Sequence, residues 1–525
     1  MKKTFLYILL SGTVAMTACK KNFLEREPLD GYSESSLWGS DKDALAAING
    51  CYKDWESGLH LIYLDCGSDN AYNPYPWEGY TVLGSGNLTP NDVGDQRWSY
   101  TVVQKCNWFL AGVEQAKMDD KLRARLKGEA RFLRAYQYFI LTQLYGDVPL
   151  ITANITPAEA NKSTRTPKAE VVKFIMDELT AIVPDLPASY TGSDVGRITS
   201  GAALALKARM ALFTKQYDVC ITACNDIVKT GTYKLYPVYG DLFRIQHKNN
   251  SEIILDVQYK ENDVPFESLG VMPPGSAGGW CSIDPLQALV DAYEMKNGKT
   301  IDDATSGYDE DNPYTNRDPR LAATVIYPGA MYNGSYYNPI NEASSDYYAP
   351  YGNSKSGYLV RKFTTDLNDY ADMWNVGLNI IAIRYAEVLL SLAEAKIELN
   401  QLDNTMYDAL DAVRTRAGMP VVDRAVYNSQ TKLRELVRRE RRVELAMEGL
   451  RWFDIQRWEI GDKVMKGTVY GARLGNVDAT TGKLTLGKDR ILVEQRTFDI
   501  KKNYLWPIPQ SERDINPGLT QNPLY

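Results

Sequence analysis

Helical periodicity of apolar residues is the feature that most constrains the fold of this 525-residue chain. Between residues 122 and 144, apolar side chains recur every three or four positions, which places them on one face of a helix. These residues are Leu126, Ala130, Leu133, Tyr136, Ile140 and Leu144. Gly146 and Pro149 then predict the helix end, because glycine often closes a helix and proline cannot continue one. The pattern predicts a helix that buries this face against a partner helix, which we expect over residues 102–117.

Similar periodicity recurs in two parts of the chain. We expect further helices over residues 41–52, 168–182, 200–213, 218–228, 380–399, 403–416, 431–448 and 452–459. The pair over 380–416 occupies close to the roughly 34 residues of a tetratricopeptide-type helix–turn–helix unit. The sequence therefore predicts a mainly α fold, built as a scaffold of helix hairpins.

Between residues 234 and 377 the helical pattern fades, glycine and proline become frequent, and tyrosine accumulates. Residues 252–259 (EIILDVQY) read as a buried strand. Long irregular segments in folded proteins are usually functional, and binding proteins present such loops on a rigid scaffold. We expect one domain over 39–525, with its scaffold at about 39–233 and 378–525 and a loop-rich insertion with short strands at about 234–377.

The chain begins like a secretory signal, with two lysines before a short apolar run at residues 5–14. That run is well short of the roughly 20 residues that span a bilayer. Small residues then precede Cys19, which is where a bacterial lipoprotein carries its lipid. We predict a signal peptide over 1–18 and a lipidated tether over 19–38, with two or three acyl chains giving a durable anchor. An ordinary signal peptide with an incidental cysteine is the alternative.

The composition excludes several classes of function. Without residues 1–18, 57 of the 59 basic residues remain against 66 acidic residues, a net charge of −9 that argues against a nucleic-acid partner. His60 and His247 are the only histidines, which weighs against a His-based metal site or a Ser-His-Asp triad. We expect no metal or other cofactor. The cysteines other than Cys19 are expected to be mostly buried free thiols.

Two groups of charged residues are interpreted as scaffold and not as catalytic groups. The first is expected to form ion pairs and hydrogen bonds between helices: Glu129, Arg131, Arg134, Arg384 and Glu387. In the second, an arginine cluster at 438–442 alternates with glutamates, which predicts a solvated, salt-bridged helix face. The glutamates are Glu435, Glu440 and Glu444.

Five blocks, in order along the chain, resemble the SusD/RagB family of outer-membrane nutrient-binding lipoproteins. They are residues 126–136 (LKGEARFLRAY) with 144–150 (LYGDVPL), 383–390 (IRYAEVLL) with 393–395 (AEA), 413–418 (VRTRAG), 440–445 (ERRVEL) with 448–454 (EGLRWFD), and 506–509 (WPIP) with 521–525 (QNPLY). Residues 23–25 (FLE) also look like the N-terminus of the family. One block alone would be weak evidence for the family, but five blocks in the same order across the chain are a specific match.

The resemblance implies an α-superhelical fold with tetratricopeptide-like hairpins and a loop-rich ligand face. It also implies a non-catalytic protein that captures glycans at the cell surface and delivers them to a TonB-dependent transporter of the SusC type. Members exported to the cell surface often carry acidic residues after the lipid cysteine, whereas Lys20 and Lys21 stand here. We nevertheless expect the protein on the outer face of the outer membrane.

Glycan-binding side chains are expected in the loops, since flat aromatic rings complement the C–H face of a sugar and polar groups pair with its hydroxyls. Aromatic and polar side chains occur together in residues 69–78 and in residues 273–280, which the tyrosine-rich insertion follows. The candidates are Asp69, Asn70, Tyr72, Trp77, Trp98, Trp280 and Tyr314, with Trp77 and Trp280 preferred. Trp374 is interpreted as a core residue.

Two other functions remain open. A helical-repeat lipoprotein could bind peptides or glycopeptides on a concave face, which would explain the hairpins but not the aromatic insertion. A glycosidase could use two loop carboxylates, although no spacing in the sequence singles out such a pair.

Overall fold

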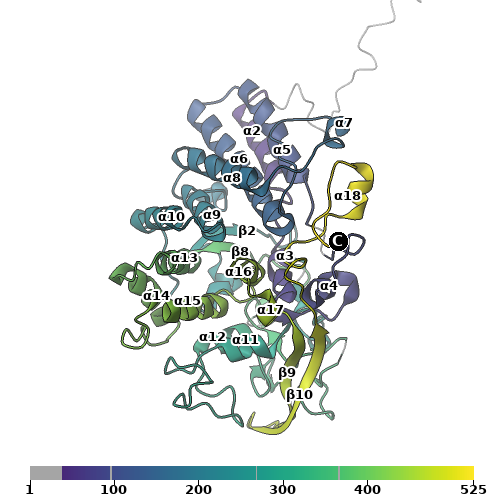
Figure 1. The fold of residues 1–525 in the computed structure, drawn as a ribbon, viewed down its shortest axis with the longest axis vertical. Helices are drawn as coiled ribbons and strands as arrows, with labels where there is room; N and C mark the ends of the chain where they lie inside the picture. Colours follow the sequence, from purple (N-terminus) through teal and green to yellow (C-terminus); the bar gives the residue numbers. More distant parts are fainter. Residues whose placement is uncertain (1–37, 95–96, 268, 350, 365–366) are drawn as a thin grey trace, which may run out of the picture.

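The computed structural model describes residues 38–525 apart from 95–96, 268, 350 and 365–366 (Figure 1). The predicted signal peptide, Cys19 and the tether up to residue 37 lie outside the described residues. Among the helices that are described, none is long and apolar enough to cross a membrane.

The N-terminal helices pack on one another in chain order, and Figure 1 shows them stacked from the top of the view down its left side. They are α2 (Asp41–Tyr52), α5 (Thr101–Gly112), α6 (Asp120–Tyr145), α8 (Lys168–Ile182), α9 (Ser200–Phe213) and α10 (Tyr217–Thr230). Helix α6 packs against α5 and α8, and α9 packs against α8 and α10. The helices therefore form successive antiparallel hairpins, as a tetratricopeptide-like scaffold requires.

The long helix α6 shows why the local sequence folds as it does. At its start the Asp119 carboxylate accepts hydrogen bonds from the backbone N–H groups of Lys121 and Leu122, which satisfies donors that have no partner inside the helix. At its end Gly146 has a φ of 77°, a conformation that glycine adopts without steric cost. The predicted helix and its apolar face are confirmed, and nearly every side chain from Leu126 onward is buried.

Helices return in the C-terminal part as α13 (Tyr385–Glu398), α14 (Asn404–Arg416), α15 (Gln430–Glu444) and α16 (Arg451–Trp458). Helix α13 packs against α14 and α15 on one side and against α9 and α10 on the other. This contact joins the two helical parts into one curved stack. The predicted mainly α fold of helix hairpins is confirmed.

One predicted helix begins five residues too early. Residues Ile380–Arg384 form strand β8, which pairs antiparallel with β2 (Ile253–Val257), and α13 begins only at Tyr385. All five side chains of β8 are buried, and a wholly buried strand has the same apolar run as a buried helix segment. The strand expected over residues 252–259 is confirmed as β2.

Short strands tie the insertion to itself and to the scaffold. They are β1 (Ala71–Tyr72) with β3 (Asp284–Pro285), β4 (Val325–Ile326) with β7 (Leu359–Val360), and β5 (Met331–Tyr332) with β6 (Ser335–Tyr336). Short helices complete the fold: α3 (Gly58–Tyr63), α4 (Tyr80–Ser85), α7 (Pro157–Ala160), α11 (Gln287–Ala292), α12 (Pro319–Thr324), α17 (Gly461–Val464) and α18 (Gln510–Ile515). The β1–β3 pair holds a loop of the N-terminal part against the insertion.

A long β-hairpin lies within residues 378–525, where the sequence predicts helical scaffold. Strands β9 (Gly467–Val477) and β10 (Leu484–Arg496) pair antiparallel with several irregularities in register, and Figure 1 shows the hairpin at the lower end of the molecule. Much of β10 is exposed. Sequence reading missed the hairpin because its apolar residues alternate only weakly, so the period-2 signal is faint.

The charged residues interpreted as scaffold do pair within the fold. Arg131 and Arg134 of α6 both bind Glu178 of α8, and Arg209 of α9 binds Glu387 of α13. In the second group Glu435 is exposed, as predicted, but the predicted solvation of Glu440 and Glu444 is wrong. Glu440 and Glu444 are buried and share Arg320, which lies on α12 of the insertion. A buried charge must be paired, so this cluster fastens the insertion to α15.

The cysteines of the described part are free and buried, as predicted. They are Cys51, Cys66, Cys106, Cys220, Cys224 and Cys281. Cys220 and Cys224 lie one turn apart on the inner face of α10, with their Sγ atoms 4.0 Å apart. They pack as small apolar side chains.

Candidate ligand-binding surface

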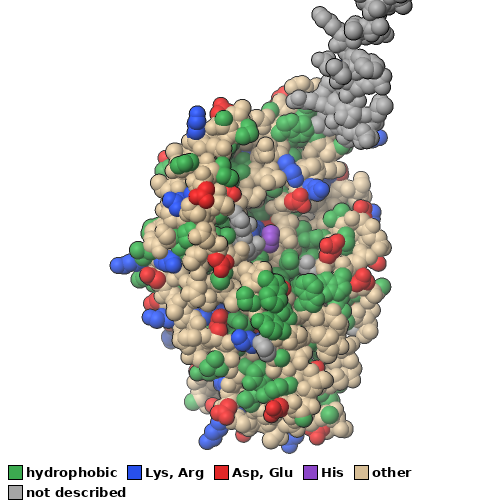
Figure 2. All heavy atoms as spheres, turned by 90° about the vertical axis from the view of Figure 1, so that its right-hand side faces the viewer, with side chains coloured by type: hydrophobic (Ala, Val, Ile, Leu, Met, Phe, Trp, Pro, Cys, Tyr) green, Lys and Arg blue, Asp and Glu red, His purple; other side chains and the backbone are tan. Residues whose placement is uncertain are grey.

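Trp77 and Trp280, the two preferred candidates, are strongly exposed, with 73% and 54% of their surfaces accessible. A large exposed aromatic side chain costs solvation free energy, so a surface that collects several of them marks an interaction site. Trp77 lies in the turn Pro76–Glu78 directly before α4, and α4 is on the right of Figure 1. Figure 2 turns that side to the viewer and shows hydrophobic side chains gathered across its middle.

Trp77 belongs to a stack of three rings. Its ring centroid lies 5.0 Å from that of Tyr75 and 5.8 Å from that of Tyr351, and the Tyr75 and Tyr351 rings are 5.4 Å apart at an angle of 18°. Tyr351 is itself 55% exposed. Offset stacking at these distances is favourable between aromatic rings, so the two exposed rings are held over Tyr75, which is buried.

Trp280 forms a second aromatic group with Trp374, at a centroid distance of 4.8 Å. The Trp280 backbone N–H donates to the Gly270 carbonyl oxygen at 2.8 Å. A Cβ at Gly270 would stand 2.4 Å from the Trp374 ring, so only glycine allows this approach. Trp374 packs against the core, as predicted, but it is only half-buried and lies beside an exposed partner.

The two aromatic groups are joined by the Tyr75 side chain. Its hydroxyl donates to the Trp280 carbonyl oxygen at 2.5 Å and accepts from the Gly352 backbone N–H at 3.0 Å. We call the set Tyr75, Trp77, Trp280, Tyr351 and Trp374 the aromatic platform. Its rings come from four segments of the chain, and the hydrogen bonds of Tyr75 fix the relative positions of three of them.

Asp69 and Asn70 lie beneath the surface. The Asp69 carboxylate pairs with Arg451 at 2.7 Å and with Arg442 at 2.9 Å. Burial alone would raise the pKa of Asp69, but the two guanidiniums outweigh it and lower the pKa to about 2. Asn70 donates to Asp65 at 2.7 Å and accepts from Arg442 at 2.9 Å. Both side chains are engaged in fastening the loop to α15 and α16.

Three aromatic candidates also pack within the protein. Trp98 is buried and meets Tyr145 edge to face at 5.0 Å. Tyr72 is buried in β1, and the Lys355 ammonium lies 4.9 Å from its ring. Tyr314 stacks on Tyr327 at 4.3 Å and shares a hydrogen bond with the Tyr358 hydroxyl. Ligand binding by these three residues stays a prediction, and none of them stands in the platform.

Two carboxyl groups lie under the platform. Burial raises the pKa of Asp284 to about 7, although the Lys355 backbone N–H and the Cys281 thiol donate to its oxygens. Burial also raises the pKa of Glu78, which accepts hydrogen bonds from Tyr63, Asn73 and Ser282. Asp284 is fully buried, so its place is structural: it holds the turn that presents Trp280.

Tyr351 and Tyr75 were not among the sequence candidates, although Tyr75 stands two residues before Trp77. The tyrosine-rich composition of the insertion pointed to the region and could not single out Tyr351. Their positions depend on contacts between distant loops. Among the described residues, no group of three or more His, Cys, Asp or Glu side chains lies close enough to hold a metal ion.

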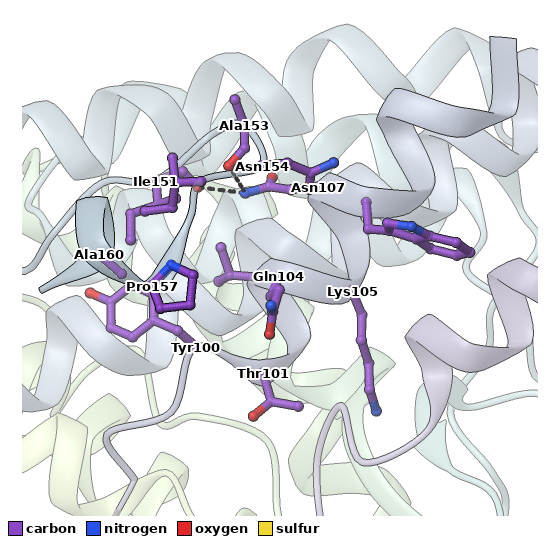
Figure 3. A pocket seen from close by; sticks show the side chains of 13 residues that line it. Tyr100, Thr101, Gln104, Lys105, Asn107, Ile151, Ala153, Asn154, Pro157 and Ala160 are labelled. Carbon is purple, nitrogen blue, oxygen red and sulfur yellow. Dashed lines mark hydrogen bonds between the residues drawn. The ribbon is translucent and has the colours of Figure 1, made fainter. Parts of the chain in front are cut away.

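A different cavity, of about 690 Å³, opens beside α5 and the loop that leads to α7 (Figure 3). Figure 3 shows the Asn107 amide reaching the carbonyl oxygens of Ile151 and Ala153, each at 3.1 Å. Trp108 forms one wall and packs on Trp38, where the described chain begins, at 5.3 Å. None of the platform residues lines this cavity.

Comparison with known proteins gives consistent matches over the whole chain. The model of the SusD family matches residues 243–525, and a model described as starch-binding associating with outer membrane matches residues 89–212. A SusD-like protein of Bacteroides ovatus is 25% identical over 99% of this chain and 98% of its own length.

Solved structures agree with these matches. The crystal structure of a SusD-like carbohydrate binding protein from Bacteroides fragilis is 33% identical, covers 92% of this chain and all of its own, and superposes with a TM-score of 0.84. A laminarin binding SusD-like protein, 22% identical, covers 93% of this chain and all of its own with a TM-score of 0.72. At that identity the second likeness shows the fold alone.

Proposed function

Because the chain belongs to the SusD family, we propose that it is a non-catalytic glycan-binding lipoprotein of the cell surface, anchored in the outer membrane through Cys19. In this proposal it captures oligosaccharides or polysaccharides and passes them to a SusC-like TonB-dependent transporter. The Bacteroides fragilis relative is titled a carbohydrate binding protein, and one matching family model is described as starch-binding.

The observation that carries the proposal is the aromatic platform. Trp77 and Tyr351 present their rings over Tyr75, and Trp280 presents its ring beside Trp374. Sugar rings have apolar C–H faces that pack on flat aromatic surfaces, while their hydroxyls remain free for hydrogen bonds. Two aromatic groups fixed side by side suit a ligand of repeated rings better than a single small molecule.

The platform also favours glycan over the peptide alternative. A peptide groove of the helix-binding or strand-binding kind offers an apolar channel or an open strand edge. The platform offers exposed rings on irregular loops instead. The strands nearest to it, β1 and β3, are only two residues long and pair with each other.

Affinity electrophoresis tests the proposal directly. Soluble protein comprising residues 20–525 is run through native gels that contain plant, host or microbial polysaccharides. Retardation by at least one polysaccharide is expected, and retardation by none across the panel would contradict glycan binding. Prolonged incubation with the same panel should release no reducing ends, whereas a glycosidase would release them.

The transporter part of the proposal needs its own experiment. Purification of the tagged protein from the outer membrane, in a detergent that keeps complexes intact, is expected to recover a TonB-dependent transporter in stoichiometric amount. Recovery of the tagged protein alone would contradict that part while leaving glycan binding in place.

A further inference from the structure

A cavity of about 910 Å³ lies where α2, α3 and the end of β2 meet, and it is separate from the aromatic platform. We call it the His60 cavity. Its volume is within the roughly 300–1,000 Å³ of small-molecule pockets. Tyr52, Trp55, His60, Gln137, Gln258 and Tyr259 are among its lining residues. It thus combines aromatic rings with side-chain amides.

The His60 cavity adjoins the platform through one hydrogen-bonded segment. Val264 stands at its rim and is 61% exposed. Two residues earlier, the Asn262 backbone N–H donates to Asn375 at 2.9 Å, and the Asn375 amide donates back to the Asn262 side chain at 2.6 Å. Asn375 directly follows Trp374 of the platform. The rim of the cavity and one platform ring are therefore fastened together.

Figure 2 agrees with this neighbourhood. The face that shows the gathered hydrophobic side chains also shows a histidine side chain above them. A long ligand that lies across this face could reach both features without bending around the molecule.

The wall of the cavity holds a buried ion pair. The Glu56 carboxylate is buried and accepts from Arg97 at 2.8 and 2.9 Å and from the Tyr136 hydroxyl at 3.1 Å. Burial would raise the pKa of Glu56, but Arg97 outweighs it and lowers the pKa to about 2. The ion pair thus persists at any physiological pH and contributes no net charge.

Another part of the lining holds a buried acid that is bonded to amides. Asp256 accepts hydrogen bonds from the Gln258 amide at 2.7 Å and from the Asn379 amide at 2.9 Å, and burial raises the pKa of its carboxyl. Besides Asp256, the lining has two basic residues, Lys53 and Arg97, and two acidic residues, Asp54 and Glu56. The cavity therefore has little attraction for an anionic or cationic ligand. Amides beside aromatic rings complement a neutral molecule with many hydroxyls.

We infer that the His60 cavity is a second subsite, which binds neutral sugar units of the glycan beyond those that lie on the aromatic platform. The inference rests on the proposed function. It predicts that affinity rises with glycan length, because a short oligosaccharide fills the platform alone and a longer one reaches the cavity as well. Affinity increases because a long glycan occupies both subsites at once, and binding at the first holds it near the second.

Val264→Trp tests the subsite, because a large side chain at this exposed rim position would narrow the cavity without disturbing the core. The matched control is Val421→Trp, a valine of 58% exposure that lines none of the described cavities. The probes are short and long neutral oligosaccharides, prepared by partial acid hydrolysis of the polysaccharide that retards the wild type, and calorimetry measures their affinities.

Wild type and Val421→Trp are expected to bind the long oligosaccharide about tenfold more tightly than the short one. Val264→Trp should bind both oligosaccharides with the affinity that the wild type has for the short one. Its melting temperature should be unchanged. A Val264→Trp protein that keeps the length gain would overturn the subsite, as would a wild type without any length gain. A wild type that binds no glycan would overturn the proposed function itself.

Discussion

The hydroxyl of Tyr75 donates a 2.5 Å hydrogen bond to the backbone carbonyl oxygen of Trp280, across 205 positions of sequence. The bond joins the loop before α4 to the insertion, and both partners belong to the aromatic platform. A platform that is already assembled loses little conformational entropy when a ligand binds. This link therefore makes the rings of two distant loops act as one surface.

Removal of either exposed indole should weaken glycan binding. Trp77→Ala and Trp280→Ala are each expected to lower affinity about tenfold, while the melting temperature stays nearly unchanged because both side chains are exposed. The matched control is Tyr470→Ala, which removes an aromatic ring of 44% exposure on β9, outside the platform. Unchanged affinity for both tryptophan variants in calorimetry would contradict this placement of the ligand.

Tyr75→Phe should distinguish the contribution of the Tyr75 hydroxyl to binding from that of its ring. The variant keeps the stack with Trp77 and Tyr351 but loses the link to Trp280, which is worth about 1 kcal/mol for a typical hydrogen bond. We expect a loss of affinity of several-fold, with a less favourable binding entropy because the platform must be ordered by the ligand. Calorimetry on wild type and variant provides both quantities. Equal affinities and entropies would mean that the loops hold their positions without this bond.

Much of the scaffold could be predicted from sequence, because helix packing leaves a strong local signal. The apolar face of α6 and the glycine that ends it are both visible in the chain. The strand β8 shows where this reasoning fails. Its five buried residues precede α13 without a break, and only pairing with β2, more than 120 positions earlier, distinguishes strand from helix.

The candidate site could be predicted only in part, because contacts between distant segments decide which loop residues are exposed. Trp77 and Trp280 could be proposed from loop composition, whereas the burial of Asp69 depends on Arg442 and Arg451, which lie far along the chain. Polar and aromatic residues in a loop look alike in sequence whether they face solvent or fasten the loop. Only the tertiary partners separate the two roles.

Asp69→Ala should destabilise the fold. The substitution leaves Arg442 and Arg451 without their buried counter-charge, and breaking such a pair costs about 3–5 kcal/mol. Urea denaturation followed by circular dichroism would measure the loss as a lower midpoint. If Asp69 instead contacts the ligand directly, the variant would keep its stability and lose glycan affinity, which calorimetry on the folded fraction would detect.

The stability of the platform region should fall as pH rises toward neutrality. Burial holds the folded-state pKa of Asp284 at about 7, above its ordinary value of 3.8, so the folded state binds a proton that the unfolded state has already lost. Stability from this group is complete below pH 3.8 and is lost progressively up to about pH 7. Thermal unfolding across this range should show a shallower pH slope for Asp284→Asn than for wild type. Identical slopes would show that Asp284 ionises normally.

Cys19→Ala should release the protein from the membrane fraction. The sequence predicts that a lipid at Cys19 attaches the protein to the membrane. Each buried acyl CH₂ contributes about 0.8 kcal/mol, and two or three chains together resist extraction by salt. The test is to express wild type and Cys19→Ala with the same signal, then fractionate and compare pellets after a high-salt wash. A transporter complex could also retain the variant, so the comparison is repeated in a strain that lacks the partner transporter. Sedimentation of Cys19→Ala with membranes in that strain would contradict lipidation at Cys19.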